Sequence, residues 1–433
     1  KTEVTLASFE RKTIHIPIKT EGYGNIKFLV EATSSQGSDR LSAETKVQDR
    51  RSLISTASFG SANKKILTTN IQYPKSIYTD QGGIHINLSP TIVNNIDQSF
   101  KYIKEYPYSC WEQKLTKALM AHLYLEYKDR LAEDFAWPNA EDTIKQTLKE
   151  AADFQADSGG MAFFVPQESL VSPYLSSYTA LAFAWLQESG YSPEEKVATD
   201  LEKYLKNFLK KNSNPQSYSQ EMAATTRSVA LAALSLKDRV EKKSIDRHAA
   251  KIDQMSLFGK ANFLLAASYS KSSEFLIEKV INNIMGHSNK TATKISFQEN
   301  IGSNFDRLLS TKSRSNCSIL LAFVAARKTV SSSMGNTIEV LARSISENRT
   351  GDHFSNTQET IFCLKALLDY AKEYENKQPN IDIEVALNEK NLGKVAFQTF
   401  KDKPKEFFEK VGKADPGKKY TAKISKSGKG RLY

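Results

Sequence analysis

The stretch Tyr106-Pro107-Tyr108-Ser109-Cys110-Trp111-Glu112-Gln113 stands directly before a segment with helical periodicity, in which Leu115 and Leu119 share one face. A cysteine three residues before a glutamine lies on the same face of a first helical turn. The sulfur of Cys110 can therefore approach the side-chain carbonyl of Gln113. Loss of ammonia would join the two groups as an internal thioester, which amines and alcohols attack more readily than an amide.

The three cysteines of the chain have different surroundings, and their number is too small for a disulfide framework. Cys317 and Cys363 stand in apolar helix-like segments, where we expect packed residues, and a bond between them stays open. Cys110 has polar and aromatic neighbours instead. The alternative interpretation of Cys110 is a buried structural cysteine beside a glutamine that starts a helix.

The octapeptide resembles the thioester signature of the alpha-2-macroglobulin and complement superfamily, and its Tyr106-Pro107-Tyr108 start is most similar to the bacterial alpha-2-macroglobulins. Two positions depart from the family pattern. Ser109 replaces the usual glycine, and Trp111 replaces a small or aliphatic residue. A second local match, Phe354-Ser355-Asn356-Thr357-Gln358-Glu359-Thr360, is similar to the Ser-Thr-Gln-x-Thr start of the last long helix in these domains.

Periodicity along the chain predicts strands, then helices, then strands again. Alternating or β-branched runs predict strands at both ends of the chain: Thr13–Ile18, Ile26–Ala32, Lys65–Thr69, Gly83–Leu88, Ile381–Leu387, Lys394–Gln398 and Tyr420–Ile424. Between them, from about Asn95, apolar segments with a helical period follow one another: Tyr178–Leu186, Val197–Leu209, Val229–Leu236, Ala261–Tyr269, Phe275–Ile284, Ile319–Ala326, Ile338–Ile345 and Ile361–Tyr370. This alternation of helix and loop suggests stacked helical hairpins, whose inner helices a closed α/α toroid would bury on nearly all sides.

The family resemblance implies a multidomain α+β fragment with an all-α thioester domain, an α/α toroid, inserted in a CUB-type β-sandwich. The end of a macroglobulin-type β-sandwich would precede it. The implied boundaries are 1–51 for the macroglobulin-like part, 52–97 and 376–433 for the two parts of the CUB-like sandwich, the second truncated, and 98–375 for the thioester domain.

The resemblance also implies a function: the thioester-bearing module of a broad-spectrum protease inhibitor in host defence, not an enzyme with turnover. Cleavage of a bait region, expected outside this chain, would expose the Cys110–Gln113 thioester, which would acylate lysine amines of the trapped protease once. Partners would be attacking proteases and the remaining macroglobulin domains. The location would be periplasmic or extracellular, with a membrane tether outside this fragment. No cofactor or metal is expected.

A thioester must stay dry until it is used. Aromatic side chains suit that shielding, and Tyr106, Tyr108 and Trp111 come from the motif itself, with Tyr218 as a further candidate. Some complement proteins use a downstream histidine to direct the acyl group to hydroxyls. The comparable loop here, 215–220, contains none, while His122 is expected on a helix face and His248 at the surface. Direct attack by amines is therefore the prediction.

Two other function classes stay open from the sequence. One is a scaffold or binding relative whose thioester never forms, and the other is a glycosidase-type enzyme on the same toroid. The net charge of +11, from 60 basic and 49 acidic residues, could suggest nucleic acid or a membrane surface. The charges are dispersed along the chain, however, so they indicate solvated faces and no nucleic-acid partner.

Overall fold

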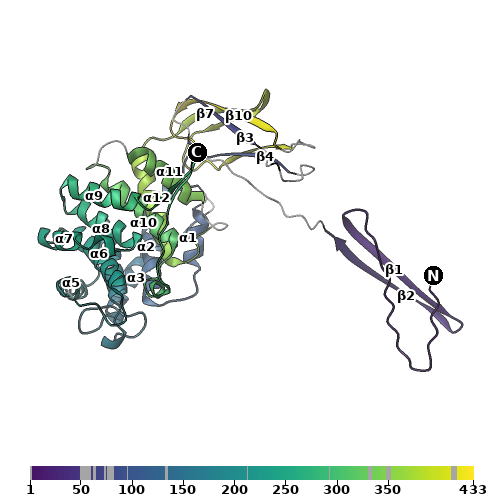
Figure 1. The fold of residues 1–433 in the computed structure, drawn as a ribbon, viewed down its shortest axis with the longest axis horizontal. Helices are drawn as coiled ribbons and strands as arrows, with labels where there is room; N and C mark the ends of the chain where they lie inside the picture. Colours follow the sequence, from purple (N-terminus) through teal and green to yellow (C-terminus); the bar gives the residue numbers. More distant parts are fainter. Residues whose placement is uncertain are drawn as a thin grey trace. The chain divides into compact units, whose positions relative to one another are not determined.

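The chain forms two compact units, residues 1–57 and 58–433 (Figure 1). The computed structural model describes residues 2–48, 60–61, 65–72, 75, 82–94, 96–131, 135–211, 213–291, 293–329, 334–347, 353–410 and 417–433. The boundary predicted between residues 51 and 52 lies outside these ranges.

The first unit contains one antiparallel hairpin, β1 (Gly24–Ser34) and β2 (Gly37–Val47). The strand predicted at Ile26–Ala32 is confirmed within β1. The strand predicted at Thr13–Ile18 is wrong, because these residues have no regular structure and pair with no described strand. No side chain is fully buried within residues 2–48, so this unit has no core of its own among the residues described.

Six strands of the second unit form two facing antiparallel sheets. One sheet has the order β3-β10-β7-β8 and the other pairs β4 with β9. Alternate side chains of β4, such as Ile84 and Ile86, pack against alternate side chains of β7, such as Ile383 and Val385, as a half-buried strand period requires. The strand bounds are β3 Ile66–Gln72, β4 Gly83–Leu88, β7 Asn380–Leu387, β8 Lys390–Phe397, β9 Lys405–Lys410 and β10 Lys419–Lys429.

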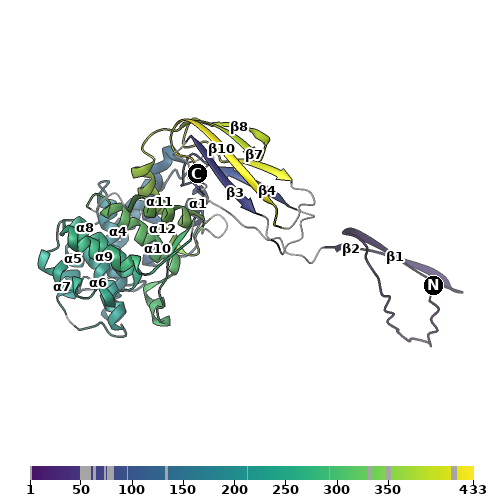
Figure 2. The ribbon, with the colours of Figure 1, turned by 45° about the horizontal axis from the view of Figure 1, so that its top comes forward.

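The helices are inserted in the sequence between the strands of this sandwich. β3 and β4 precede them and β7 to β10 follow them, yet β3 pairs with β10 and β4 with β9 (Figure 2). The helix bounds are α1 Asp97–Lys104, α2 Trp111–Tyr127, α3 Ala140–Lys149, α4 Pro173–Gln187, α5 Glu195–Lys210, α6 Gln220–Ser235, α7 Lys242–Ala249, α8 Leu257–Tyr269, α9 Glu274–Met285, α10 Lys312–Ala326, α11 Gly335–Glu347 and α12 Thr357–Tyr374. A short hairpin, β5 (Ser288–Lys290) and β6 (Ile295–Phe297), interrupts them.

The even-numbered helices form a closed ring. Contacts run from α2 to α4, α6, α8, α10 and α12, and α12 returns to α2. The odd-numbered helices α1, α3, α5, α7, α9 and α11 pack outside this ring. Burial follows this arrangement: nearly all of α6 and α8 is buried, whereas α5 buries one stripe that includes Val197, Leu201 and Leu205.

The ring helices run parallel to one another, since the N-terminal end of one helix contacts the N-terminal end of the next, and the C-terminal ends contact each other likewise. At the starts, the side chains of Glu112 and Gln358 are hydrogen-bonded between α2 and α12. At the ends, Lys372 of α12 pairs with Glu126 of α2, and Ser235 bonds to Ser270 just after α8. We call the side of the ring with the six helix starts the start face, and the opposite side the end face.

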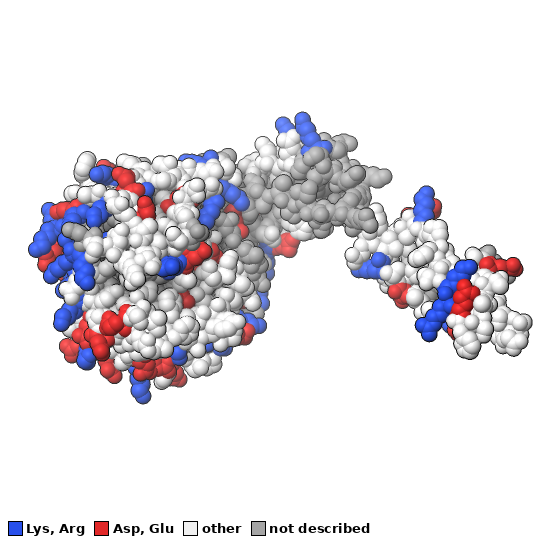
Figure 3. Space-filling model, turned by 60° about the horizontal axis from the view of Figure 1, so that its bottom comes forward, with Lys and Arg blue, Asp and Glu red and all other residues white. Residues whose placement is uncertain are grey.

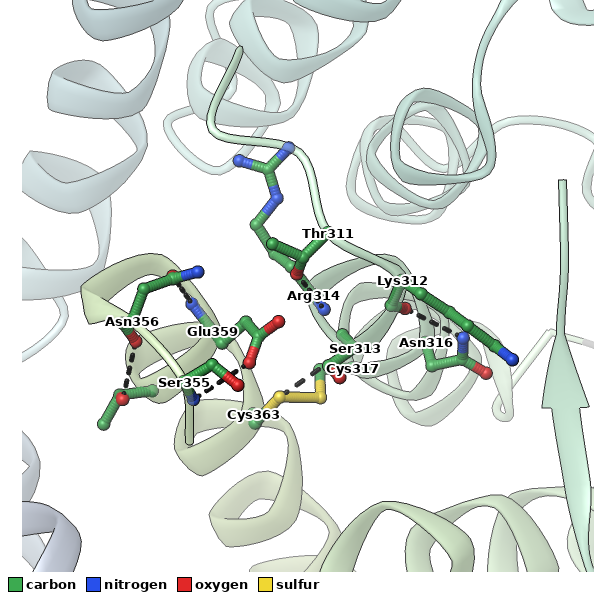
Figure 4. Close-up of a disulfide and its surroundings, with 11 residues drawn as sticks. Thr311, Lys312, Ser313, Arg314, Asn316, Cys317, Ser355, Asn356, Glu359 and Cys363 are labelled. Atoms are coloured by element: carbon green, nitrogen blue, oxygen red, sulfur yellow. Dashed lines mark hydrogen bonds between the residues drawn. A yellow bond between two sulfur atoms is a disulfide. The ribbon is translucent and has the colours of Figure 1, made fainter. Parts of the chain in front are cut away.

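A disulfide between Cys317 and Cys363 joins α10 to α12 inside the ring (Figure 4). Both cysteines are buried, so the packing predicted from the sequence is confirmed and the bond between them, left open there, is present. Lys, Arg, Asp and Glu side chains of both signs appear on the helical surface in Figure 3. Within the described ranges, no helix is both long enough and apolar enough to span a membrane.

Candidate thioester site

The start of α2 brings Cys110 and Gln113 together in a reciprocal capping arrangement. Cys110 is the N-cap, in an extended conformation, and its sulfur accepts the backbone N–H of Gln113. The side-chain oxygen of Gln113 in turn accepts the backbone N–H of Cys110 at 3.0 Å. Both side chains thus fold back over one turn, which places the thiol beside the carboxamide that it would have to attack.

Cysteine at this position is unusual within the ring. The other five ring helices begin with a side chain whose oxygen accepts a backbone N–H, the ordinary way to cap a helix: Ser172 for α4, Ser219 for α6, Ser256 for α8, Thr311 for α10 and Asn356 for α12. Only α2 among these six uses sulfur, a weak acceptor. A serine would cap the helix better than a cysteine, so capping alone does not account for Cys110.

The thiol of Cys110 is buried, while the residues that lead into it are more open. Cys110 is 8% exposed, and burial raises the pKa of its thiol, opposed by the backbone N–H groups of Gln113 and Glu112. Tyr106 is half-buried and packs edge-on against Tyr108 at 5.7 Å. Tyr108 is 69% exposed, so of these two predicted shielding residues Tyr106 is the better covered.

Trp111 belongs to the core between α2 and α4. Its ring is fully buried, stacks on Phe154 at 5.1 Å and meets Phe183 edge-on at 6.5 Å. Its indole N–H donates to the hydroxyl of Thr179 at 2.9 Å, and its backbone N–H donates to the carbonyl of Phe163. The large residue at this position therefore fixes the start of α2 against α4.

Glu112 carries a hydrogen-bond network that the sequence interpretation missed. Its carboxylate is 3% exposed and accepts bonds from the hydroxyls of Thr116 (2.9 Å) and Thr357 (3.0 Å) and from the amide of Gln358 (2.7 Å). Burial raises the pKa of Glu112, although these bonds and nearby Arg314 oppose the rise. The match at Thr357-Gln358 predicts the start of a helix, but it does not predict a bond between these residues and Glu112.

The network continues to a buried arginine. The amide oxygen of Gln358 accepts the hydroxyl of Tyr174 at 2.7 Å, and that hydroxyl accepts an N–H of Arg314 at 2.6 Å. Arg314 is fully buried, donates to the carbonyl of Leu308 and lies 3.9 Å from the ring centre of Phe258. Residues from the starts of α2, α4, α8, α10 and α12 are thus in contact at the start face.

The remaining predicted residues take three different places. Tyr218 is partly buried against the start of α4, where burial raises the pKa of its hydroxyl. His122 is buried on α2 and bonds to Ser189 at 2.8 Å, which agrees with a helix-face residue. The surface position predicted for His248 is wrong: it is 2% exposed, because the polar segment around it forms α7, whose inner side packs against the ring.

A histidine that the sequence interpretation passed over lies near the motif. His353 stacks flat on Tyr102 with ring centres 4.1 Å apart, and Tyr102 meets Tyr106 edge-on at 5.4 Å. The Nδ1–H of His353 donates to the carbonyl of Phe354. Among the described residues, no group of three or more His, Cys, Asp or Glu side chains is arranged to hold a metal ion.

Solved bacterial alpha-2-macroglobulin structures match this arrangement of helices and strands at low sequence identity. The chain covers 63% of a native Escherichia coli alpha-2-macroglobulin structure that spans domain MG7 to the C-terminus, with a TM-score of 0.57 and 13% identity over 94% of this chain. A Salmonella alpha-2-macroglobulin reacted with methylamine matches with a TM-score of 0.58, at 12% identity over 94% of this chain and 29% of that one.

A third match is the Escherichia coli protein activated by porcine elastase, with a TM-score of 0.55, 15% identity and coverage of 95% of this chain and 35% of that one. No protein-family model and no curated protein matches the sequence. The chain thus has the fold of a part, about two thirds, of the region from domain MG7 to the C-terminus of the Escherichia coli protein, at 63% coverage. The resemblance predicted from the octapeptide is confirmed at the level of the fold.

Proposed function

We propose that this chain is the thioester-bearing part of a bacterial alpha-2-macroglobulin-like protease inhibitor. The capping arrangement of Cys110 and Gln113 carries the proposal, because it puts a thiol and a carboxamide on one turn of a helix in a fold that bacterial alpha-2-macroglobulins have. Trapped proteases, the remaining macroglobulin domains and a bait region outside this chain would be its partners. It would act once per molecule and not as an enzyme.

The chemistry requires two balanced steps. In the first, the sulfur of Cys110 attacks the side-chain carbonyl of Gln113, a C–S bond replaces the C–N bond, and the thiol proton leaves with ammonia. In the second, an amine attacks that carbonyl after bait cleavage, forms an amide and releases the sulfur, which takes up the proton lost by the amine. Burial of Cys110 supports the survival of the thioester between the two steps, since a thioester lasts only where water is excluded.

Amines are the nucleophiles that we propose for the second step. The loop of residues 215–220 has no histidine that could form an acyl-imidazole and direct the acyl group to hydroxyls. A lysine side chain of the captured protease would then attack in its unprotonated form. Tyr106, Tyr108, Trp111 and Tyr218 remain proposed shielding residues, of which Trp111 and Tyr218 are covered by the helical ring.

The domain assignment follows from the same proposal. The closed ring of six helices supports an α/α-toroid thioester domain over 98–375, and the split sandwich supports a CUB-like domain over 52–97 and 376–433. Residues 1–51 would be the end of a macroglobulin-like sandwich. The Cys317–Cys363 disulfide supports an oxidising location such as the periplasm or the extracellular space.

Intact mass spectrometry tests the proposal. Purified protein should weigh about 17 Da less than the sequence with one disulfide, and methylamine should add about 31 Da and expose one thiol. The variants Cys110→Ser and Gln113→Glu should show neither change. Methylamine should react much faster than glycerol at equal concentration. An unmodified mass together with a freely titratable Cys110 would overturn the proposal and favour the scaffold alternative.

A further inference from the structure

The start face contains a buried carboxylate between the two candidate thioester residues. Glu112 is the second residue of α2, so its side chain projects from the same turn that carries Cys110 and Gln113. It points into the ring, where its carboxyl group accepts bonds from the hydroxyls of Thr116 and Thr357 and from the amide of Gln358. Three hydrogen bonds therefore fix the position of this buried side chain, and two of them come from another helix.

These bonds connect parts of the chain that are far apart in sequence. Thr357 and Gln358 are 245 and 246 residues beyond Glu112, at the first two positions of α12. Gln358 is itself held by Tyr174 of α4 and lies 3.4 Å from an N–H of Arg314. The first turn of α2 is therefore attached to the starts of three other ring helices.

We propose that Glu112 is a positioning residue, which holds the first turn of α2 on α12 so that Cys110 and Gln113 keep the geometry for forming and protecting the thioester. This inference rests on the proposed function. Without the bonds to Thr357 and Gln358, the turn loses its attachment to α12, while Trp111 still holds it against α4. Small changes in the placement of reacting groups have large effects on rate.

The chain offers a matched control at the other end of α12. Glu375, the residue that follows this helix, is 3% exposed and accepts bonds from the hydroxyl of Thr91 (2.6 Å) and the backbone N–H of Ile92 (2.8 Å). It resembles Glu112 in burial and in bonding to a threonine, but it holds residues that lie just after β4. Loss of Glu375 should lower stability without touching Cys110.

The experiment compares two pairs of variants, Glu112→Gln with Glu375→Gln and Thr357→Val with Thr91→Val. For each, intact mass gives the fraction of thioester at purification and the rate at which the mass deficit disappears in amine-free buffer. We expect Glu112→Gln to lose the deficit about tenfold faster than wild type, which corresponds to the net contribution of one hydrogen bond. Thr357→Val should act in the same direction, and both controls should keep the wild-type rate.

The double variant Glu112→Gln, Gln358→Glu reverses one hydrogen bond. The amide at 112 would donate to a carboxylate at 358, which would still accept from Tyr174 and Arg314, so the wild-type rate should return. A wild-type protein without the mass deficit overturns the proposed function itself. A wild type that has the deficit, together with equal rates in the 112 and 375 variants and in the Thr357 and Thr91 variants, overturns only the positioning role.

Discussion

The two faces of the helical ring differ in the partners of their buried charged side chains. At the start face, the carboxylate of Glu112 and the guanidinium of Arg314 are both buried, and neutral side chains, chiefly Gln358, stand between them. At the end face, Lys365 binds Asp369 directly at 2.7 Å, one turn along the same helix. Burial would lower the pKa of Lys365, but Asp369 beside it raises the value instead.

This difference determines at which face the bonds of the charged side chains depend on the exact positions of the helices. A direct pair on one helix tolerates small movements, because its two partners move together. A carboxylate held by donors from two helices loses bonds as soon as those helices shift, and a partly satisfied buried network is costly. The start face is therefore the more sensitive to change, and it is also where the candidate thioester lies.

The largest expected effect comes from removing the buried arginine. Arg314→Met should lower the unfolding free energy of the helical part by about 5 kcal/mol, because Glu112 is then buried without a nearby positive charge. Lys365→Met should cost about 2 kcal/mol, since the partly exposed Asp369 side chain can be hydrated. Urea unfolding followed by tryptophan fluorescence measures both, because all three tryptophans, at 111, 137 and 185, lie in the helical part. Equal costs for the two variants would contradict the contrast between the faces.

The disulfide should be the next most important element. It closes a loop across 46 residues, for which chain entropy gives about 4 kcal/mol. The variant Cys317→Ala, Cys363→Ala should lower stability by about this amount. Because both cysteines lie in the first half of their helices, amide hydrogen exchange should increase more at the start of α12 than at its end. Uniform loss of protection along α12 would argue against a special role at the start face.

Acid should destabilise the helical part through His248. Burial lowers the pKa of His248 to about 4, whereas an unfolded histidine has a pKa near 6.5. The unfolded state therefore binds the proton first as the pH falls, and about 3 kcal/mol should be lost between pH 7 and pH 4. His248→Gln should remove this loss, as urea titrations at the two pH values would measure. An unchanged acid loss in the variant would show that His248 is not the group responsible.

In the His248→Gln background, the two faces should respond to pH with opposite signs. Burial raises the pKa of Glu112, so the stability that it contributes is present below about pH 4.3 and is lost as the pH rises. Burial lowers the pKa of His122, so its contribution is present above about pH 6.5 and is lost as the pH falls. Glu112→Gln should flatten the alkaline side of the stability profile and His122→Asn the acid side. The same slope change in both variants would refute this assignment.

The smallest effect is expected at the rim of the start face. Tyr108 is mostly exposed, so Tyr108→Ala should change the unfolding free energy by less than about 0.5 kcal/mol. If Tyr108 helps to shield the thioester, the mass deficit should nevertheless disappear faster in the variant. Wild-type rates of hydrolysis would remove Tyr108 from the shielding residues and leave that role to Tyr106, Trp111 and Tyr218.

The sequence predicted what depends on neighbours along the chain. The i, i+3 spacing placed Cys110 and Gln113 on one turn, and each segment predicted to be helical overlaps a helix. Three short amphipathic helices, α1, α3 and α7, were not predicted, because each buries only a few residues of one face. Because α7 was not predicted, the burial of His248 on its inner side was not predicted either.

The rest could not be predicted, because it depends on residues that meet only in the folded chain. Nothing near Glu112 in the sequence indicates that its partners are at Thr357 and Gln358. The alternation at Thr13–Ile18 resembles a strand, but alternation produces a strand only where another strand supplies hydrogen bonds. The disulfide likewise needed the three-dimensional distance between α10 and α12.

The parallel arrangement of the ring helices also gives the molecule an electrical axis. Every α-helix has a dipole with its positive end at the first turn, and six aligned helices place those ends on the start face. Negative charge that develops on the carbonyl oxygen of Gln113 or on the departing sulfur of Cys110 would lie in this favourable field. Lys365, beside the C-terminal cap of α4, has the complementary position, where the field stabilises a cation. The polarity of the ring thus favours negative charge at the start face and opposes the buried charge of Arg314 there.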